Sequence, residues 1–217
     1  MAEKNYLSVI SGATAENIRL TRRKMVQRLL AGAGAAWPLA ASSHPIYELL
    51  RNNDAILDEA EQLGAANWKP IFLSSQQTEI LTAMAESIVP GSTRAHVTRF
   101  LDLLLGVDKR ENQQKFAESL SAMAAEAQKR FDKPFPALDE GQKNAFLTDA
   151  SAKPDKPESS GTGAAHKQSM LYGHFENLKG WISGAYYSSE VGMCELGWTG
   201  DYAFAAFPGC AHPEGYH

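Results

Sequence analysis

The chain has 217 residues, of which 44% are hydrophobic, enough for one domain with a buried core. Six of its 21 basic residues and two of its 25 acidic residues lie in residues 1–41, so the remainder has 15 basic and 23 acidic side chains and a net charge of −8. This balance argues against a nucleic-acid-binding protein, which needs clustered Lys and Arg to displace counterions from phosphates.

Residues 1–41 have the layout of an export signal. Arg22 and Arg23 precede an Ala- and Gly-rich run from Leu29 to Ala41, which is too short to cross a bilayer core about 30 Å thick. The order Thr-Arg-Arg-x-Met-Val resembles the twin-arginine signal, which carries folded proteins across bacterial membranes. Two alternatives are a basic amphipathic helix with an incidental Arg pair and an uncleaved N-terminal helix that tethers the chain. We expect a periplasmic protein that reaches a membrane only through partners or the uncleaved signal.

Apolar residues at helical spacing predict five helices, at residues 74–88, 95–105, 111–131, 139–147 and 165–183. Ser74 with Gln77 has the spacing of a capping box, and Asp139 stands three residues before Gln142. The apolar stripes are interpreted as core and not as cofactor contacts. Alternation of the strand type is nearly absent. The sequence therefore predicts an all-α protein with a single helical domain over residues 42–217.

Two segments of this domain depart from the helical pattern. Residues 151–163 are rich in Pro, Gly and Ser and are predicted to form a polar loop. Residues 186–217 are predicted to be an irregular tail rich in Gly and aromatic side chains. The aromatic side chains of the tail need a surface to cover, either the helical body or another protein. The candidate partner contacts are Tyr186, Tyr187, Trp198, Tyr202, Phe204 and Phe207.

Both cysteines, Cys194 and Cys210, lie in the predicted tail. A disulfide between them is a candidate in an exported protein, and on the chain-entropy view it would stabilise the fold by roughly 3 kcal/mol. A cross-link from either cysteine to a partner chain and a pair of free thiols are the alternatives.

No motif for redox or hydrolytic catalysis is evident. The sequence lacks a strand followed by GxGxxG, and it lacks CxxCH, HExxH, paired CxxC and GxSxG. Two cysteines are too few for a four-cysteine iron–sulfur cluster. We therefore predict no catalytic, cofactor-binding or metal-binding residue. The alternative is an autonomous periplasmic metal- or thiol-dependent enzyme that uses Cys210 and His212, with His217 and either Cys194 or His174 as further ligands.

The chain resembles the gluconate 2-dehydrogenase subunit 3 family over about residues 20–215. The resemblance lies in LTRRKMVQRLL, LSSQQTEILTAMAESIVPG, VTRFLDLLL and EAQKRFDKPFPALDEGQKNAFL, and most specifically in the tail YYSSEVGMCELGWTGDYAFAAFPGC with its following HPEG. The segment after Pro90 is shorter than is usual in this family, and the polar insert at 151–163 is unusual. These departures bear on which partner the chain binds.

The resemblance implies the small subunit of a bacterial, membrane-associated sugar or sugar-acid dehydrogenase. In such complexes a large subunit of the glucose–methanol–choline oxidoreductase type carries FAD, and a cytochrome c subunit often accepts the electrons. The small subunit has no redox centre, helps the large subunit to mature and supplies the twin-arginine signal. We therefore expect a non-catalytic accessory subunit with no cofactor of its own and FAD in its partner.

Overall fold

The protein is helical throughout the part of the chain that the structure describes. The computed structural model describes residues 46, 49, 54–60, 62–154 and 163–197, and no strand occurs in these ranges. The predicted all-α class is confirmed. The predicted export signal at 1–41 lies outside the described residues.

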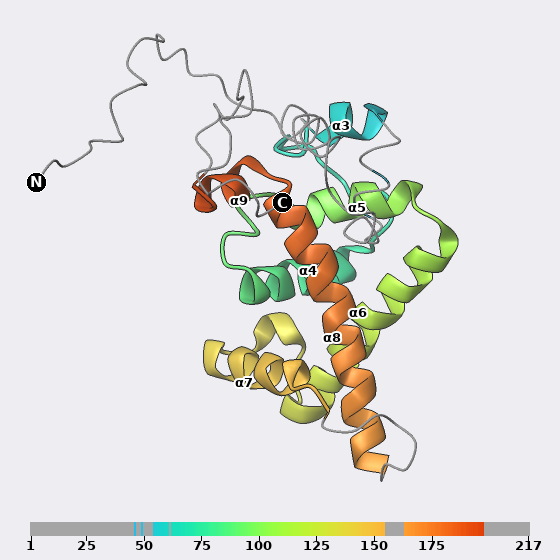
Figure 1. Ribbon diagram of the computed structural model, residues 1–217, viewed down its shortest axis with the longest axis vertical. Helices are drawn as coiled ribbons and strands as arrows, with labels where there is room; N and C mark the ends of the chain where they lie inside the picture. Colours follow the sequence, from blue (N-terminus) through green and yellow to red (C-terminus); the bar gives the residue numbers. More distant parts are fainter. Residues whose placement is uncertain (1–45, 47–48, 50–53, 61, 155–162, 198–217) are drawn as a thin grey trace, which may run out of the picture.

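One long helix, α8, organises the molecule (Figure 1). The elements in chain order are α3 (Asp54–Ala60), α4 (Ser75–Ile88), α5 (Val97–Val107), α6 (Arg110–Phe131), the 3-10 helix η2 (Phe135–Ala137), α7 (Glu140–Ser151), α8 (Gly163–Tyr187) and α9 (Glu190–Glu195). Helix α8 packs against α4, α5, α6, α7 and α9. Its contact with α6 includes an edge-to-face pair of Phe116 and Trp181, with ring centroids 5.9 Å apart.

The predicted helix starts at α4 and α7 are confirmed down to the capping bonds. The Ser74 hydroxyl accepts from the Gln77 amide at 3.2 Å, and the Gln77 side chain accepts from the Ser74 amide at 2.9 Å. Asp139 and Gln142 make the same reciprocal pair before α7. Each pair satisfies two amides that the helix itself leaves without an acceptor.

The apolar stripes predicted for the helices form the core. The buried side chains of the stripes are Ile80, Leu81, Met84 and Ala85 on α4, Val97, Phe100, Leu101 and Leu104 on α5, Phe116, Leu120, Met123 and Ala127 on α6, and Leu171, Phe175, Leu178 and Ile182 on α8. Helix α5 is buried on nearly all sides, because α3, α4, α6 and α8 all pack against it.

The expectation of an irregular tail from residue 186 onward is wrong for residues 186–187 and 190–195, which are helical. Helix α8 continues through Tyr187, and residues 190–195 form α9. Ser189 ends one helix and begins the next: its hydroxyl donates to the Tyr186 carbonyl at 2.6 Å and accepts from the Gly192 amide at 3.1 Å. This cap makes a short helix possible in a Gly-containing stretch. Residues 198–217 lie outside the described residues.

Two smaller differences concern the helix boundaries. Helix α3 was not predicted from the sequence, and Ile56 and Ala60 on it are buried in the core. The predicted polar loop at 151–163 is shorter than expected, because Ser151 still belongs to α7 and Gly163 already belongs to α8. Within this loop, the structure describes only residues 152–154 as non-helical.

Helix α5 holds the segment before α4 through one anion and one cation. The buried Asp102 carboxylate accepts from the backbone amides of Ile71, Phe72 and Leu73 at 2.7, 3.0 and 2.7 Å. One turn earlier, the Arg99 guanidinium donates to the carbonyls of residues 63 and 65 at 2.6 and 3.1 Å and lies over the Trp68 ring at 5.1 Å. Together these charge-assisted bonds fix residues 63–73 on the surface of α5.

Replacing Asp102 with Ala should destabilise the protein by about 3 kcal/mol or more, because three amides would lose their acceptor in a buried place. Urea unfolding of the full chain measures the loss. Glu118→Ala, at an exposed position of α6, is the matched control and should change the free energy of unfolding by less than about 0.5 kcal/mol. Equal effects of the two substitutions would contradict this role of Asp102.

Candidate functional site

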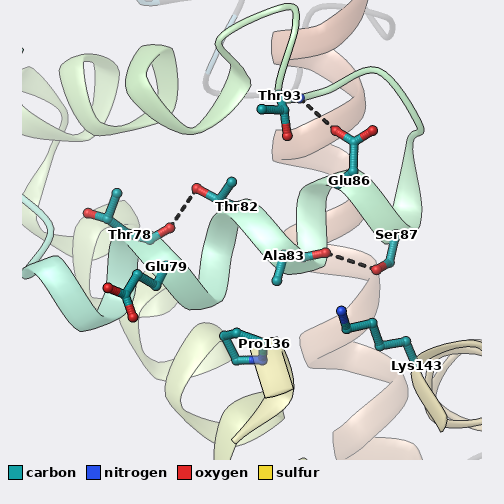
Figure 2. A pocket seen from close by; sticks show the side chains of 9 residues that line it. All are labelled: Thr78, Glu79, Thr82, Ala83, Glu86, Ser87, Thr93, Pro136 and Lys143. Carbon is teal, nitrogen blue, oxygen red and sulfur yellow. Dashed lines mark hydrogen bonds between the residues drawn. The ribbon is translucent and has the colours of Figure 1, made fainter. Parts of the chain in front are cut away.

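An open groove of about 540 Å³ lies between α4 and the η2–α7 region (Figure 2). Its lining is rich in hydroxyl and charged side chains, and several of these form bonds within the fold itself. The Thr82 hydroxyl donates to the Thr78 carbonyl at 2.7 Å, and the Ser87 hydroxyl donates to the Ala83 carbonyl at 2.9 Å. A hydroxyl that donates its proton to a carbonyl of its own helix is not donating that proton to a general base.

Glu86, on the rim of the groove, holds the turn that follows α4. Its carboxylate accepts from the backbone amides of Gly91 and Thr93 at 2.8 and 2.7 Å. Burial by itself would raise the pKa of Glu86, but these hydrogen bonds and the positive charge of Arg94 outweigh it and lower the pKa below its usual value of 4.5. Glu86 is therefore a structural anion, and it is not poised as a general acid.

The turn that Glu86 holds packs against the junction between α8 and α9. Tyr186, the second-last residue of α8, is fully buried there. A Cβ atom on Gly91 would lie 3.0 Å from the Tyr186 hydroxyl, and one on Gly192 would lie 2.9 Å from the Tyr186 carbonyl carbon. Gly91 also has a φ of +91°. Any side chain at position 91 or 192 would crowd Tyr186, so only glycine lets both turns pack this closely against it.

The Tyr186 hydroxyl has no hydrogen-bond partner among the described residues. Burial, and after it the nearby Glu195 carboxylate, raises the pKa of Tyr186 to about 12. The phenol therefore stays protonated at physiological pH.

The predicted partner contacts divide into three groups. Tyr186 is buried inside its own chain, so the expectation that it faces a partner is corrected: at four residues after Ile182 it continues the core stripe of α8. Tyr187 is 40% exposed and stacks edge-on against Tyr186, with ring centroids 5.2 Å apart. The remaining four, Trp198, Tyr202, Phe204 and Phe207, lie outside the described residues.

The cysteine and histidine candidates are not brought together within the described part of the chain. Cys194 is exposed on α9, whereas Cys210, His212 and His217 lie outside the described residues, so the disulfide stays a prediction. His174 lies on α8, where its Nδ1 is 3.2 Å from the Ser119 hydroxyl of α6. No group of three or more His, Cys, Asp or Glu side chains suited to a metal ion occurs in the residues described. Arg22 and Arg23 also lie outside them.

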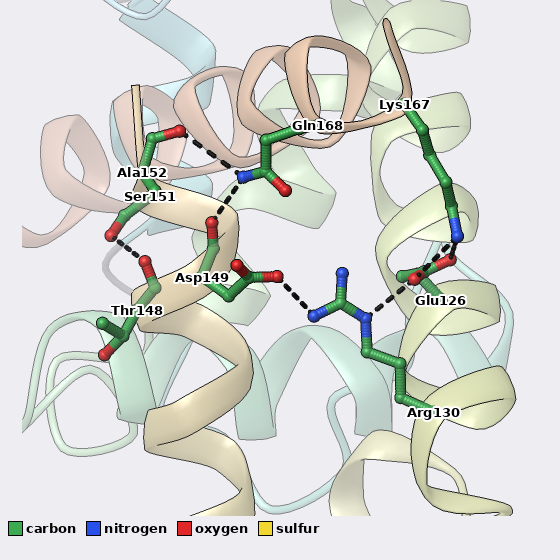
Figure 3. A network of polar contacts seen from close by, with 8 residues as sticks. All are labelled: Glu126, Arg130, Thr148, Asp149, Ser151, Ala152, Lys167 and Gln168. Atoms are coloured by element: carbon green, nitrogen blue, oxygen red, sulfur yellow. Dashed lines mark hydrogen bonds and ion pairs between the residues drawn. The ribbon is translucent and has the colours of Figure 1, made fainter. Parts of the chain in front are cut away.

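A second polar cluster joins α6, α7 and α8 (Figure 3). Arg130 of α6 pairs with Glu126 on its own helix and with Asp149 of α7, while Lys167 of α8 pairs with Glu126 at 2.9 Å. Gln168 donates to the carbonyl of Asp149 at 2.7 Å. Burial opposes ionisation of Glu126, but its bonds to Arg130 and Lys167 prevail and lower its pKa. Because each charge has an opposite partner, this cluster serves to hold three helices together.

The comparisons with known proteins decide the family. The family model described as gluconate 2-dehydrogenase subunit 3 matches residues 75–209. The chain belongs to this family. The match begins at the first residue of α4 and passes beyond α9, so it includes the Glu86 turn, Asp102 and the two glycines around Tyr186.

As a gluconate 2-dehydrogenase subunit 3, the chain is a subunit of a dehydrogenase complex and associates with other subunits of that complex. Comparisons with curated proteins and with solved structures gave no match. Among the helices that the structure describes, none has the length and apolarity needed to cross a membrane.

Sequence reasoning missed Asp102 and the enclosing role of Gly91 and Gly192. A signal was present for Asp102, because it is the only acidic residue in the otherwise apolar segment VTRFLDLLLGV. A lone acid among buried positions indicates a carboxylate with a specific partner. The glycines carried no comparable signal, since their neighbour Tyr186 is distant from Gly91 in the sequence.

Gly192→Ala should destabilise the protein by about 1–3 kcal/mol, because the added methyl group would collide with the Tyr186 backbone. Thermal unfolding measures the change. Gly173→Ala is the matched control: it is also a helical glycine, but its Cβ would meet nothing within 4 Å, so it should stabilise by about 0.5–1 kcal/mol. The prediction is contradicted if both substitutions stabilise.

Glu86→Gln should lower the free energy of unfolding at neutral pH. It should also make that free energy change less as the pH falls. The pKa of Glu86 is depressed by folding, so the stabilisation is present above its usual pKa of 4.5 and is lost as the pH falls through and below that value. Denaturant midpoints measured from neutral to acidic pH should converge for the wild type and the variant. Glu118→Gln, at an exposed position of α6, should follow the wild type.

Proposed function

We propose that this chain is the non-catalytic small subunit of a periplasmic FAD-dependent sugar or sugar-acid dehydrogenase. It binds a large flavoprotein subunit of the glucose–methanol–choline oxidoreductase type, assists its maturation and exports it under a twin-arginine signal. A cytochrome c subunit is a further partner in this proposal. The observation that carries the proposal is the family match over residues 75–209.

Features of the described residues support a binding role over a catalytic one. The hydroxyls of the groove and the Glu86 carboxylate are occupied by bonds within the chain. In contrast, the α8–α9 end exposes apolar side chains, with Tyr187 at 40% and Leu196 at 65% exposure. Large apolar side chains that remain exposed are typical of surfaces that bind another protein. The aromatic residues from Trp198 to Phe207 follow directly in the sequence, and in the proposal they extend this contact.

The proposal also accounts for a folded-protein export signal on this chain. The twin-arginine route accepts folded cargo, and FAD must be inserted before a flavoprotein leaves the cytoplasm. A small subunit with Arg22 and Arg23 that binds the loaded flavoprotein would export both chains. In this proposal Cys194 and Cys210 pair after export, either with each other or with the partner, because the periplasm is oxidising.

Replacing Arg22 and Arg23 together with Lys should stop export of both chains while leaving their association intact. In the native host, fractionation should find the tagged chain and a bound flavoprotein in the cytoplasm, with dye-linked dehydrogenase activity missing from the periplasm. Arg19→Lys, a charge-conserving change in the same segment, should export normally. Purified wild-type chain that brings down no flavin-containing subunit would refute the proposal, as would a yellow and active preparation of this chain alone.

A further inference from the structure

The hydroxyl of Tyr186 is buried and has no hydrogen-bond partner in the part of the chain that the structure describes. A phenylalanine would fill the same place, because the ring continues the apolar stripe of α8 after Ile182. In this structure the hydroxyl therefore adds an unfavourable free energy of desolvation and no hydrogen bond. A buried polar group of this kind is rare in native proteins and requires an explanation.

Among the described groups around this hydroxyl, the carboxylate of Glu195 is an anionic acceptor. Burial, and after it the negative charge of Glu195, raises the pKa of Tyr186, so the two groups are neighbours. The nearby Arg94 guanidinium only donates hydrogen bonds. The carbonyl of Gly91, whose turn faces the hydroxyl, already accepts from the amide of Ala95 at 3.0 Å. Glu195 is therefore the acceptor whose chemistry suits the phenol best.

The packing of the two turns around Tyr186 places Glu195 beside it. Glu195 stands three residues after Gly192 on α9, and Gly192 packs directly on the Tyr186 backbone. The Glu195 carboxylate lies 4.0 Å from the guanidinium of Arg94, which stands three residues after Gly91. The side chain of Glu195 is 51% exposed. Exposed side chains change rotamer within nanoseconds, so this carboxylate samples several positions around Arg94.

We propose that Glu195 and Tyr186 form a latch that ties the last turn of α9 to the core. In this structure the latch is open, because the carboxylate lies beside Arg94 and the hydroxyl has no acceptor. When the latch closes, the Tyr186 hydroxyl donates to the Glu195 carboxylate, and Arg94 stays beside the same anion. A hydrogen bond from a buried phenol to a carboxylate is charge-assisted, so it is stronger than one between neutral groups.

Helix α9 is weakly held at its C-terminal end, where the latch acts. The helix has six residues, packs mainly on α8, and has Gly192 as its buried residue. The Ser189 cap holds its first turn, whereas its last turn leads into Gly197, which has a φ of +80°. Elements with few buried contacts open locally at a small cost in free energy. The latch therefore determines how firmly the last turn is held, with the exposed side chains of Cys194 and Leu196 on or next to it.

The latch is a property of the chain alone and does not depend on the proposed function. In the proposed complex it has a further effect, because Leu196 lies directly after the tied turn and is 65% exposed. A side chain whose backbone is already ordered loses less conformational entropy when it binds a partner.

The test is a double-mutant cycle on the full chain with Tyr186→Phe and Glu195→Ala. With Glu195 present, Tyr186→Phe removes the latch bond and should lower the thermal unfolding temperature by about 2–4 °C. In the Glu195→Ala background the hydroxyl has no acceptor to lose, so the same substitution should raise this temperature by about 2–4 °C. Tyr172→Phe, at a half-buried position of α8, is the matched control and should have the same effect in both backgrounds.

Hydrogen exchange shows whether the change is located on α9. The amides of Leu196 and Gly197 donate to carbonyls within α9 at 3.0 to 3.3 Å. Without the latch these hydrogen bonds open more often, so Tyr186→Phe should speed the exchange of the two amides about threefold or more. Tyr172→Phe should leave their exchange unchanged.

Two outcomes would overturn the latch. If Tyr186→Phe raises the unfolding temperature of the otherwise wild-type chain, the hydroxyl has no acceptor in solution. If the substitution has the same effect with and without Glu195, the acceptor is another group or a water molecule. A Glu118→Ala background, which lacks an exposed acid of α6, should give the same lowering as the wild type. None of these measurements involves the flavoprotein, so the latch and the proposed function stand or fall separately.

Discussion

A single carboxylate, that of Asp102, determines how the chain enters the helical core. It lies on α5, the helix that is buried on nearly all sides, and it binds three consecutive amides just before the Ser74 cap. The start of α4 is therefore tied to the centre of the molecule. Arg99, one turn earlier, holds the other end of the same segment through the carbonyls of residues 63 and 65. A short buried helix thus carries both charges that orient the loop around it.

The α8–α9 junction shows a different solution to close packing. Gly91 and Gly192 have no side chains there, and this lets the backbone at both positions pack closely against Tyr186. The junction leaves the Tyr186 hydroxyl buried without a partner among the described residues, which is unfavourable by itself. The packing of the surrounding fold offsets this unfavourable free energy. The hydroxyl lies where α9 leads into the C-terminal part of the family match.

The elements that depend on neighbours in the sequence could be predicted, and those that depend on distant neighbours could not. Each capping box joins residues three apart, so the sequence alone could predict both of them: Ser74 with Gln77 and Asp139 with Gln142. The backbone amides that Asp102 binds are 29 to 31 residues away in the sequence, and no local sequence pattern predicts them. Helix α9 has only six residues and depends on contact with Tyr186, so its composition alone suggested irregular structure. Tyr186 itself was recoverable, since it continues the spacing of the α8 stripe.

The cluster around Arg130 has a consequence for the connection between α7 and α8. Arg130 and Lys167 bring the end of α7 and the beginning of α8 to the same side of α6, and Gln168 donates to the carbonyl of Asp149 near the last turn of α7. The two anchor points of the connection are thus held by contacts that do not involve its own sequence. Lengthening such a connection adds only closure entropy, about 0.6 kcal/mol for each doubling. An insertion between α7 and α8 is therefore expected to leave the packing of these two helices on α6 undisturbed.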